Sequence, residues 1–203
     1  MTIVLDASYT TGLEREWRRL AAAGTWWTGV QRVAIAATAR AARDGDGTPT
    51  GDLSQAATDA AIRLSVDPHV DQRWIDDLVA RGLALGPYVE LLAIVTRISA
   101  IDSFFFGIGV DRPELPDALP GDPSRLVVEE AEIQGALVPT VGVPFPPTAL
   151  SSVPAETDAL MDLHEVLYLS MFEMGDQHLV KDLHRIQIEF VAARTSLLND
   201  CFY

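Results

Sequence analysis

The sequence contains a single cysteine, Cys201, which excludes an internal disulfide. It is also poor in basic residues, because 15 lysines and arginines stand against 29 aspartates and glutamates, for a formal net charge of −14. A surface with this excess of negative charge repels a phosphate backbone. We therefore expect no nucleic-acid partner.

Long apolar runs are missing as well. No stretch reaches the roughly 18 apolar residues that a membrane span needs. The most apolar segment, residues 88–110, is interrupted by Glu90, Arg97 and Asp102. Residues 1–8 contain no basic region followed by an apolar run, so no signal peptide is expected. These observations predict a cytoplasmic protein with no membrane partner.

Helical periodicity is abundant. Apolar residues recur at helical spacing and are bounded by glycine, proline and capping residues. The pattern predicts helices over residues 13–23, 28–43, 53–64, 74–79 and 87–107. No segment alternates apolar and polar residues as a half-buried strand would, so the predicted fold class is all-α.

Residues 111–154 have a different character, because they carry most of the prolines. The run Pro144-Phe145-Pro146-Pro147 excludes a regular helix or a central strand. Only residues 126–134 suit a short helical turn. We interpret this segment as a Pro-rich connector or wrapping arm. Beyond it, two further helices are predicted, over residues 154–174 and from residue 180 to the end.

Two helical segments resemble each other in sequence. Residues 30–45 align with residues 186–201, with identities at Gln31 and Gln187, Ala36-Ala37 and Ala192-Ala193, and Asp44 and Asp200. We interpret the match as a sign of two halves of related design. The predicted organisation is a degenerate N-terminal helical half (1–110), the connector (111–154) and a C-terminal helical half (155–203).

The candidate catalytic side chains lie near the end of the sequence. Glu189 lies on an Ala-rich helix, twelve residues before Cys201. The first copy of the repeat has Val33 and Gly45 at the corresponding positions, so it lacks both groups. The two candidate catalytic residues are therefore Glu189 and Cys201.

This ending, IEFVAARTSLLNDCFY, resembles the signature helix of the alkylhydroperoxidase-like, carboxymuconolactone decarboxylase superfamily. In that family a glutamate is followed twelve residues later by Cys-x-x-Cys, and then by a histidine. Residues 82–109 resemble the helix that precedes this region in two-part members of the family. The resemblance touches about half of the chain, and it implies a helical bundle of the alkylhydroperoxidase-like type.

The resemblance also implies a function, which is thiol-dependent hydroperoxide reduction. A thiol attacks a peroxide as thiolate, a histidine can take its proton, and a glutamate can orient that histidine. A second thiol then resolves the sulfenic acid as a disulfide. Cys201 matches the resolving cysteine and Glu189 the relay acid. A homo-oligomer, a dithiol reductant protein as partner and no bound cofactor are further expectations.

The sequence departs from the family pattern at Tyr203. The second cysteine, which attacks the peroxide in the family, would come next, and the histidine would follow it. Neither is present in the printed sequence. We therefore expect a peroxidase lineage without peroxidase activity in this chain as written, and a truncated helix at its end.

Two alternatives remain open. One is a non-catalytic helical scaffold or assembly subunit. The other is a carboxymuconolactone decarboxylase-like lyase for a small carboxylated substrate, which the net charge disfavours unless Arg97, Arg185 or Arg194 gather locally. A metal site is not expected, because His178 and His184 are six residues apart, which is not the three- or four-residue spacing that places two ligands on one helix face.

Overall fold

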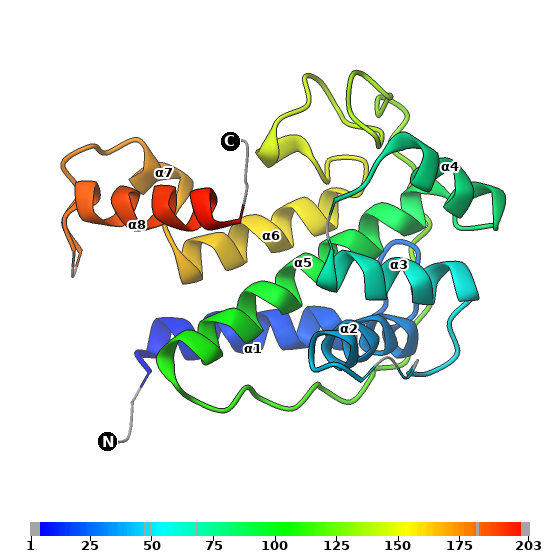
Figure 1. The fold of residues 1–203 in the computed structure, drawn as a ribbon, viewed down its shortest axis with the longest axis horizontal. Helices are drawn as coiled ribbons and strands as arrows, with labels where there is room; N and C mark the ends of the chain where they lie inside the picture. Colours follow the sequence, from blue (N-terminus) through cyan, green and yellow to red (C-terminus); the bar gives the residue numbers. More distant parts are fainter. Residues whose placement is uncertain (1–4, 47, 49, 68, 182, 200–203) are drawn as a thin grey trace.

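The computed structural model describes residues 5–46, 48, 50–67, 69–181 and 183–199, and all regular structure within them is helical. Figure 1 shows the helices. Their bounds are α1 (Ala7–Ala21), α2 (Gly29–Arg43), α3 (Gln55–Val66), α4 (Gln72–Ala80), α5 (Leu85–Ile108), the 3-10 turn η1 (Pro146–Thr148), α6 (Pro154–Leu167), α7 (Met171–Met174) and α8 (Arg185–Leu198). The predicted all-α class is confirmed.

Capping residues set where the first helices begin. The side chain of Thr28 accepts a hydrogen bond from the backbone N–H of Gln31, and the Gln31 side chain accepts one from the Thr28 N–H, which starts α2. The helix predicted from residue 13 begins earlier, at Ala7, because Asp6 accepts the backbone N–H of Ser8 at 2.9 Å.

The core forms around α5. Helices α2, α3 and α5 pack against one another, and α6 covers α1 and α5. Buried alanines such as Ala36, Ala39 and Ala60 let these helix backbones approach closely. Among the described residues, only α5 is long and apolar enough to cross a membrane, but 50% of its most apolar window is buried inside the bundle, as in the core helix of a globular domain.

The Pro-rich segment wraps back over the first two helices. The Trp17 indole N–H donates to the Glu114 carbonyl at 2.7 Å. The backbone N–H groups of Leu119 and Arg125 donate to the carbonyls of Ala21 and Thr25. Of the helical turn predicted over residues 126–134, one hydrogen-bonded turn forms, in which the Ala131 N–H donates to the Val128 carbonyl. No helix follows it, because Glu132 forms an isolated bridge with Thr140.

The helix predicted over residues 154–174 is interrupted. α6 ends at Leu167, and Ser170 caps the short α7 by accepting the backbone N–H of Glu173. The last helix begins at Arg185 rather than at residue 180, because Val180 and His184 form a bridge that turns the chain. Local capping therefore ends one helix and delays the next.

The last two helices lie apart from the core. Neither α7 nor α8 contains a buried residue. In Figure 1, α8 lies beyond the end of α6 that is farthest from α4. We call residues 170–181 and 183–199 the C-terminal arm. The alkylhydroperoxidase-like form of the bundle and its division into two related halves stay predictions.

Candidate functional site

The predicted relay acid, Glu189, lies at the junction of α6 and α8. Its Oε1 atom accepts a hydrogen bond from the Tyr168 hydroxyl at 3.0 Å and lies 2.6 Å from Arg185 Nη2. Tyr168 directly follows α6, so this bond joins the end of the bundle to the C-terminal arm. Burial, followed by the bond to Glu189, raises the pKa of the Tyr168 hydroxyl, which keeps it a hydrogen-bond donor.

Tyr168 is held from its other side by a histidine. The His164 ring lies edge-on to the Tyr168 ring, with centroids 5.2 Å apart. His164 Nδ1 lies 2.7 Å from the Leu169 carbonyl oxygen, which orients the imidazole. The order of contacts is therefore His164, Tyr168, Glu189, Arg185. The sequence pattern identified Glu189 alone, because the other partners are brought to it by the turn after α6.

An open apolar groove runs beside this cluster. It encloses about 460 Å³ and is lined by Tyr168, Leu183, Ile188, Val191, Ala192 and Thr195. Four of these residues form one stripe of α8, at spacings of three and four residues. Tyr168 and Thr195 are the polar residues of a lining that is otherwise apolar. This arrangement suits a ligand with an apolar body and a polar end.

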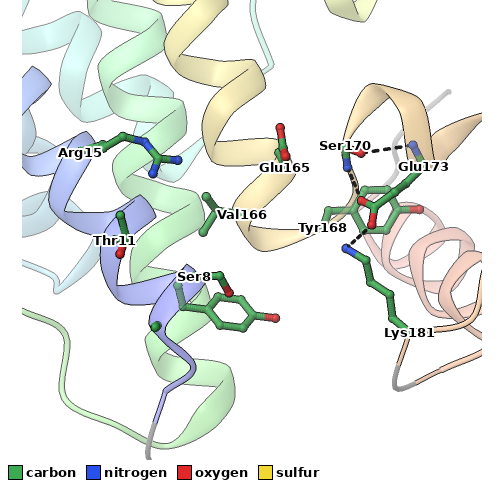
Figure 2. Close-up of a pocket in the computed structure, with 11 residues that line it drawn as sticks. Ser8, Thr11, Arg15, Glu165, Val166, Tyr168, Ser170, Glu173 and Lys181 are labelled. Atoms are coloured by element: carbon green, nitrogen blue, oxygen red, sulfur yellow. Dashed lines mark hydrogen bonds and ion pairs between the residues drawn. The ribbon is translucent and has the colours of Figure 1, made fainter.

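A second cavity of about 650 Å³ separates the bundle from the C-terminal arm (Figure 2). Arg15 and Thr11 of α1 lie on one side of it, and Glu173 and Lys181 lie on the other. Lys181 Nζ lies 2.8 Å from Glu173 Oε1, and the Ser170 backbone N–H donates to Glu173 Oε2 at 2.8 Å. The contact with Lys181, followed by the bond from Ser170, lowers the pKa of the Glu173 carboxyl to about 2. Glu173 thus stays ionised, and its charge is already balanced inside the cavity wall.

Cys201, the other predicted site residue, lies outside the described residues. The last described residue, Asn199, follows the end of α8 at Leu198. The structure therefore brings Glu189 together with Tyr168 and Arg185, and the relation of Glu189 to Cys201 stays a prediction from sequence.

A buried chain of alternating charges crosses the core, and the sequence pattern did not identify it. Glu16 Oε1 lies 2.6 Å from Arg97 Nε, and Arg97 Nη1 lies 2.6 Å from Glu156 Oε2. Arg32 Nη1 then lies 2.7 Å from Glu156 Oε1 and also pairs with Glu90. All five side chains are buried. The available signal was the charged pair seven residues apart, Glu90 and Arg97, on the most apolar helix.

The buried chain continues outward to the second cavity. Arg19 Nη1 lies 3.7 Å from Glu16 Oε2 and 2.5 Å from Asp162 Oδ2. Asp162 in turn forms a two-point contact with Arg15, at 2.7 and 3.0 Å. Four arginines and four acids thus alternate across α1, α2, α5 and α6. Their charges balance, which suits a buried network.

The local backbone makes room for this network. A Cβ atom on Gly24 would overlap Arg32 Nη1 and a Glu90 carboxylate oxygen, so a larger residue there would have to displace the Arg32–Glu90 pair. The Trp26 backbone N–H donates to Glu90 Oε2 at 2.6 Å. Burial still raises the pKa of the Glu90 carboxyl, whereas Arg97 and Arg32 outweigh burial at Glu156 and lower its pKa. The buried arginines and acids of this network pair with one another, so their presence in the core is explained without a bound substrate.

The described residues were also compared with the needs of a metal site and of a site for a carboxylated substrate. Within the described residues, no group of three histidines, cysteines or acids is placed to hold a metal ion. Arg97 is enclosed by Glu16 and Glu156, and Arg185 lies against Glu189. The arginines that would collect a carboxylated substrate are therefore already paired with acids, apart from Arg194 on the exposed side of α8.

Comparisons with protein-family models, with curated proteins and with solved structures find no significant match to this chain. The family resemblance therefore rests on the residues of the sequence alone.

Proposed function

We propose that this chain is the helical body of an alkylhydroperoxidase-like thiol oxidoreductase, in which α8 carries the relay acid Glu189 and leads to the resolving cysteine, Cys201. The observation that supports the proposal is the placement of Glu189. A carboxylate on a solvent-exposed helix normally needs no partner, yet this one is held by Tyr168 and Arg185 beside an apolar groove. A fixed carboxylate at the edge of a ligand-sized groove suits proton transfer.

The proposed reaction needs two thiols in the complete motif. The attacking thiolate forms an S–O bond with the terminal peroxide oxygen while the O–O bond breaks, and the leaving alkoxide takes a proton to become an alcohol. Cys201 then attacks the sulfenic acid, forms a disulfide and releases water. A dithiol partner reduces this disulfide through exchange and is itself oxidised. Glu189 would orient the group that moves the first proton.

Hydroperoxide consumption with dithiothreitol as reductant tests this proposal. The chain as printed is compared with a form lengthened after Tyr203 by the cysteine and histidine of the family pattern. We expect turnover only in the lengthened form. A Glu189→Gln substitution in that form should slow turnover by about 10²- to 10⁴-fold, the range for a lost acid–base group.

Two matched controls make the test specific. The lengthened form with serine in place of the added cysteine should be inactive. Cys201→Ser should slow turnover and make its rate depend on the dithiothreitol concentration, because the sulfenic acid then loses its intramolecular partner and is resolved by direct attack of dithiothreitol. Equal activity in the printed chain and in the lengthened form would contradict the proposed roles. Inactivity of both forms would exclude the peroxidase proposal.

A second candidate function, an assembly subunit, is favoured by the C-terminal arm. Apolar side chains there are exposed, among them Phe172 (91%), Phe190 (73%) and Ile186 (71%). Monomeric proteins seldom expose contiguous apolar patches above about 600 Å². Light scattering coupled to gel filtration tests this candidate. A homo-oligomer is expected, and a monomer at every concentration would exclude it.

A further inference from the structure

Helix α8 has apolar side chains on two separate faces. Ile188, Val191 and Ala192 line the groove, whereas Ile186, Phe190 and Leu197 point elsewhere. The last three are between 66% and 73% exposed. An apolar face of a helix is normally packed against another element. The groove lies on one of the two apolar faces, and the other face is exposed to solvent.

That other face has the spacing of a coiled-coil seam. Ile186, Phe190, Ala193 and Leu197 are separated by four, three and four residues, which is the d-a-d-a order of a heptad repeat. All four are exposed. The groove-lining residues fall outside this series. We call these four residues the α8 seam.

Charged residues flank the α8 seam on its two sides. Glu189 precedes Phe190 and so takes the g position, and Arg194 follows Ala193 and takes the e position. In a parallel pair of helices, each g residue lies next to the e residue five positions further along the partner. Glu189 would therefore meet Arg194 of the partner subunit, and the two-fold symmetry would repeat the contact.

An antiparallel pair would lack these ion pairs. There g positions face g positions and e positions face e positions. With Phe190 opposite Ala193, Glu189 would lie near Ser196 of the partner subunit and Arg194 near Gln187 of the partner subunit, so neither charge would meet an opposite one. The flanking charges thus select the parallel arrangement over the antiparallel one.

We propose that α8 pairs in parallel with α8 of a second copy of this chain, through the α8 seam. The proposal gives the assembly-subunit candidate its surface and orientation, and it rests on that candidate. It does not depend on the thiol chemistry, because the groove lies on a different face of the helix. Glu189 contributes one carboxylate oxygen to Tyr168 and Arg185, which leaves the other free for the partner.

The seam itself exposes large apolar side chains. Ile186, Phe190 and Leu197 are 71%, 73% and 66% exposed, and together they present roughly 300 Å², taking roughly 150 Å² for each fully exposed side chain. A stable interface buries about 800 Å² on each partner. The seam therefore supplies the apolar centre of the proposed interface and not its whole area.

Two adjacent alanines provide the sharpest test. Ala193 lies in the seam and Ala192 in the groove, so they differ in position and not in size. In a Cys201→Ser background, Ala193→Cys should form an intermolecular disulfide with oxidised glutathione as oxidant, because equivalent d positions face each other in a parallel pair. Ala192→Cys should not. Non-reducing electrophoresis measures both.

The orientation has its own control. A mixture of Phe190→Cys and Ala193→Cys chains would crosslink to each other in an antiparallel pair, since these positions then face each other. In the parallel pair each variant should crosslink to itself in preference. A predominant mixed product would overturn the proposed orientation.

Charge and packing variants complete the experiment. Arg194→Glu should raise the dimer Kd at least about tenfold, and Arg194→Lys should change it little. Phe190→Asp should give a monomer, whereas Val191→Asp, on the groove face, should leave a dimer. A wild-type monomer would overturn both this proposal and the assembly candidate. A wild-type oligomer that survives Phe190→Asp would overturn the seam alone.

Discussion

Helices α2 and α8 begin alike and end in different surroundings. Each opens with a capping box whose third residue is glutamine, Thr28 with Gln31 in α2 and His184 with Gln187 in α8. Thr28 and His184 also correspond in the alignment of residues 30–45 with residues 186–201. Yet α2 is largely buried in the core, whereas α8 has no buried residue.

The difference is clearest at equivalent positions. Ile35 and Ala36 of α2 are fully buried against α3 and α5, and their counterparts Val191 and Ala192 line the open groove. Two helices with similar sequence patterns can therefore begin with the same kind of cap, while one is buried in the core and the other is exposed. Which residues of a helix are buried depends on the other elements that pack against it. The residues of the helix alone do not determine this.

The strongest test of the comparison is to remove the more deeply buried of the two arginines that α2 buries, Arg32 rather than Arg40. Arg32→Met should destabilise the protein by about 3–5 kcal/mol, because Glu90 and Glu156 are left as buried carboxylates with less compensation. The corresponding change on α8, Ile188→Met, should alter stability by less than about 1 kcal/mol. Urea unfolding measures both. Similar values for the two variants would contradict the assigned environments.

Truncation of an apolar side chain also tests the difference in burial between α2 and α8. Ile35→Ala should cost about 2–5 kcal/mol, because it leaves a cavity in a closed core. Val191→Ala should cost less than about 0.5 kcal/mol at concentrations where the chain is monomeric, since its side chain is 58% exposed. Thermal unfolding of both variants at matched concentration is the measurement. A large loss for Val191→Ala in the monomer would show that α8 is covered within one chain.

Acid should weaken the buried network that α8 lacks. Although burial acts in the opposite direction, Arg97 and Arg32 lower the pKa of Glu156 below its ordinary 4.5. A lowered carboxyl pKa contributes stability above the unfolded value, and this contribution is lost as the pH falls through the folded pKa. The stability difference between wild type and Glu156→Gln should therefore shrink below pH 4.5. Urea unfolding across this range is the test, and a constant difference would contradict it.

The smallest effect concerns the contact that ties α8 to the bundle. Burial and then Glu189 raise the pKa of Tyr168 above its ordinary 10.0. Glu189→Gln should lower this pKa but not restore it fully, because the burial remains. Ultraviolet titration of tyrosinate, with Tyr168→Phe to assign the signal, measures the shift. An unchanged titration would show that the hydrogen bond between Tyr168 and Glu189 does not form in solution.

The helix pattern could be predicted where local signals agree. The predicted helix over residues 28–43 matches α2 almost to the residue, because Thr28 and Gln31 form a capping box. The prediction failed over residues 154–174, because the apolar pattern continues through Tyr168 while the backbone turns there. Periodicity indicates which residues suit a helix, but not that the backbone turns at Tyr168 and that a new cap at Ser170 begins the next helix.

The candidate site could be predicted only in part. The motif identified Glu189 from its spacing to Cys201, but Tyr168 reaches Glu189 across a turn that no spacing rule contains. The charges of the core were visible as interruptions in an apolar segment. Their partners were not, because Glu16 and Glu156 come from helices distant in sequence.

By itself, the sequence determined the helical class, the start of α2 at its Thr28 cap and the acidic net charge, since each depends on residues close together in the chain or on composition. Only the tertiary structure decided which apolar faces are covered and which buried charges meet. Burial and pairing depend on atoms contributed by distant segments, and a charge such as Arg97 is tolerable inside a protein only where those segments supply Glu16 and Glu156.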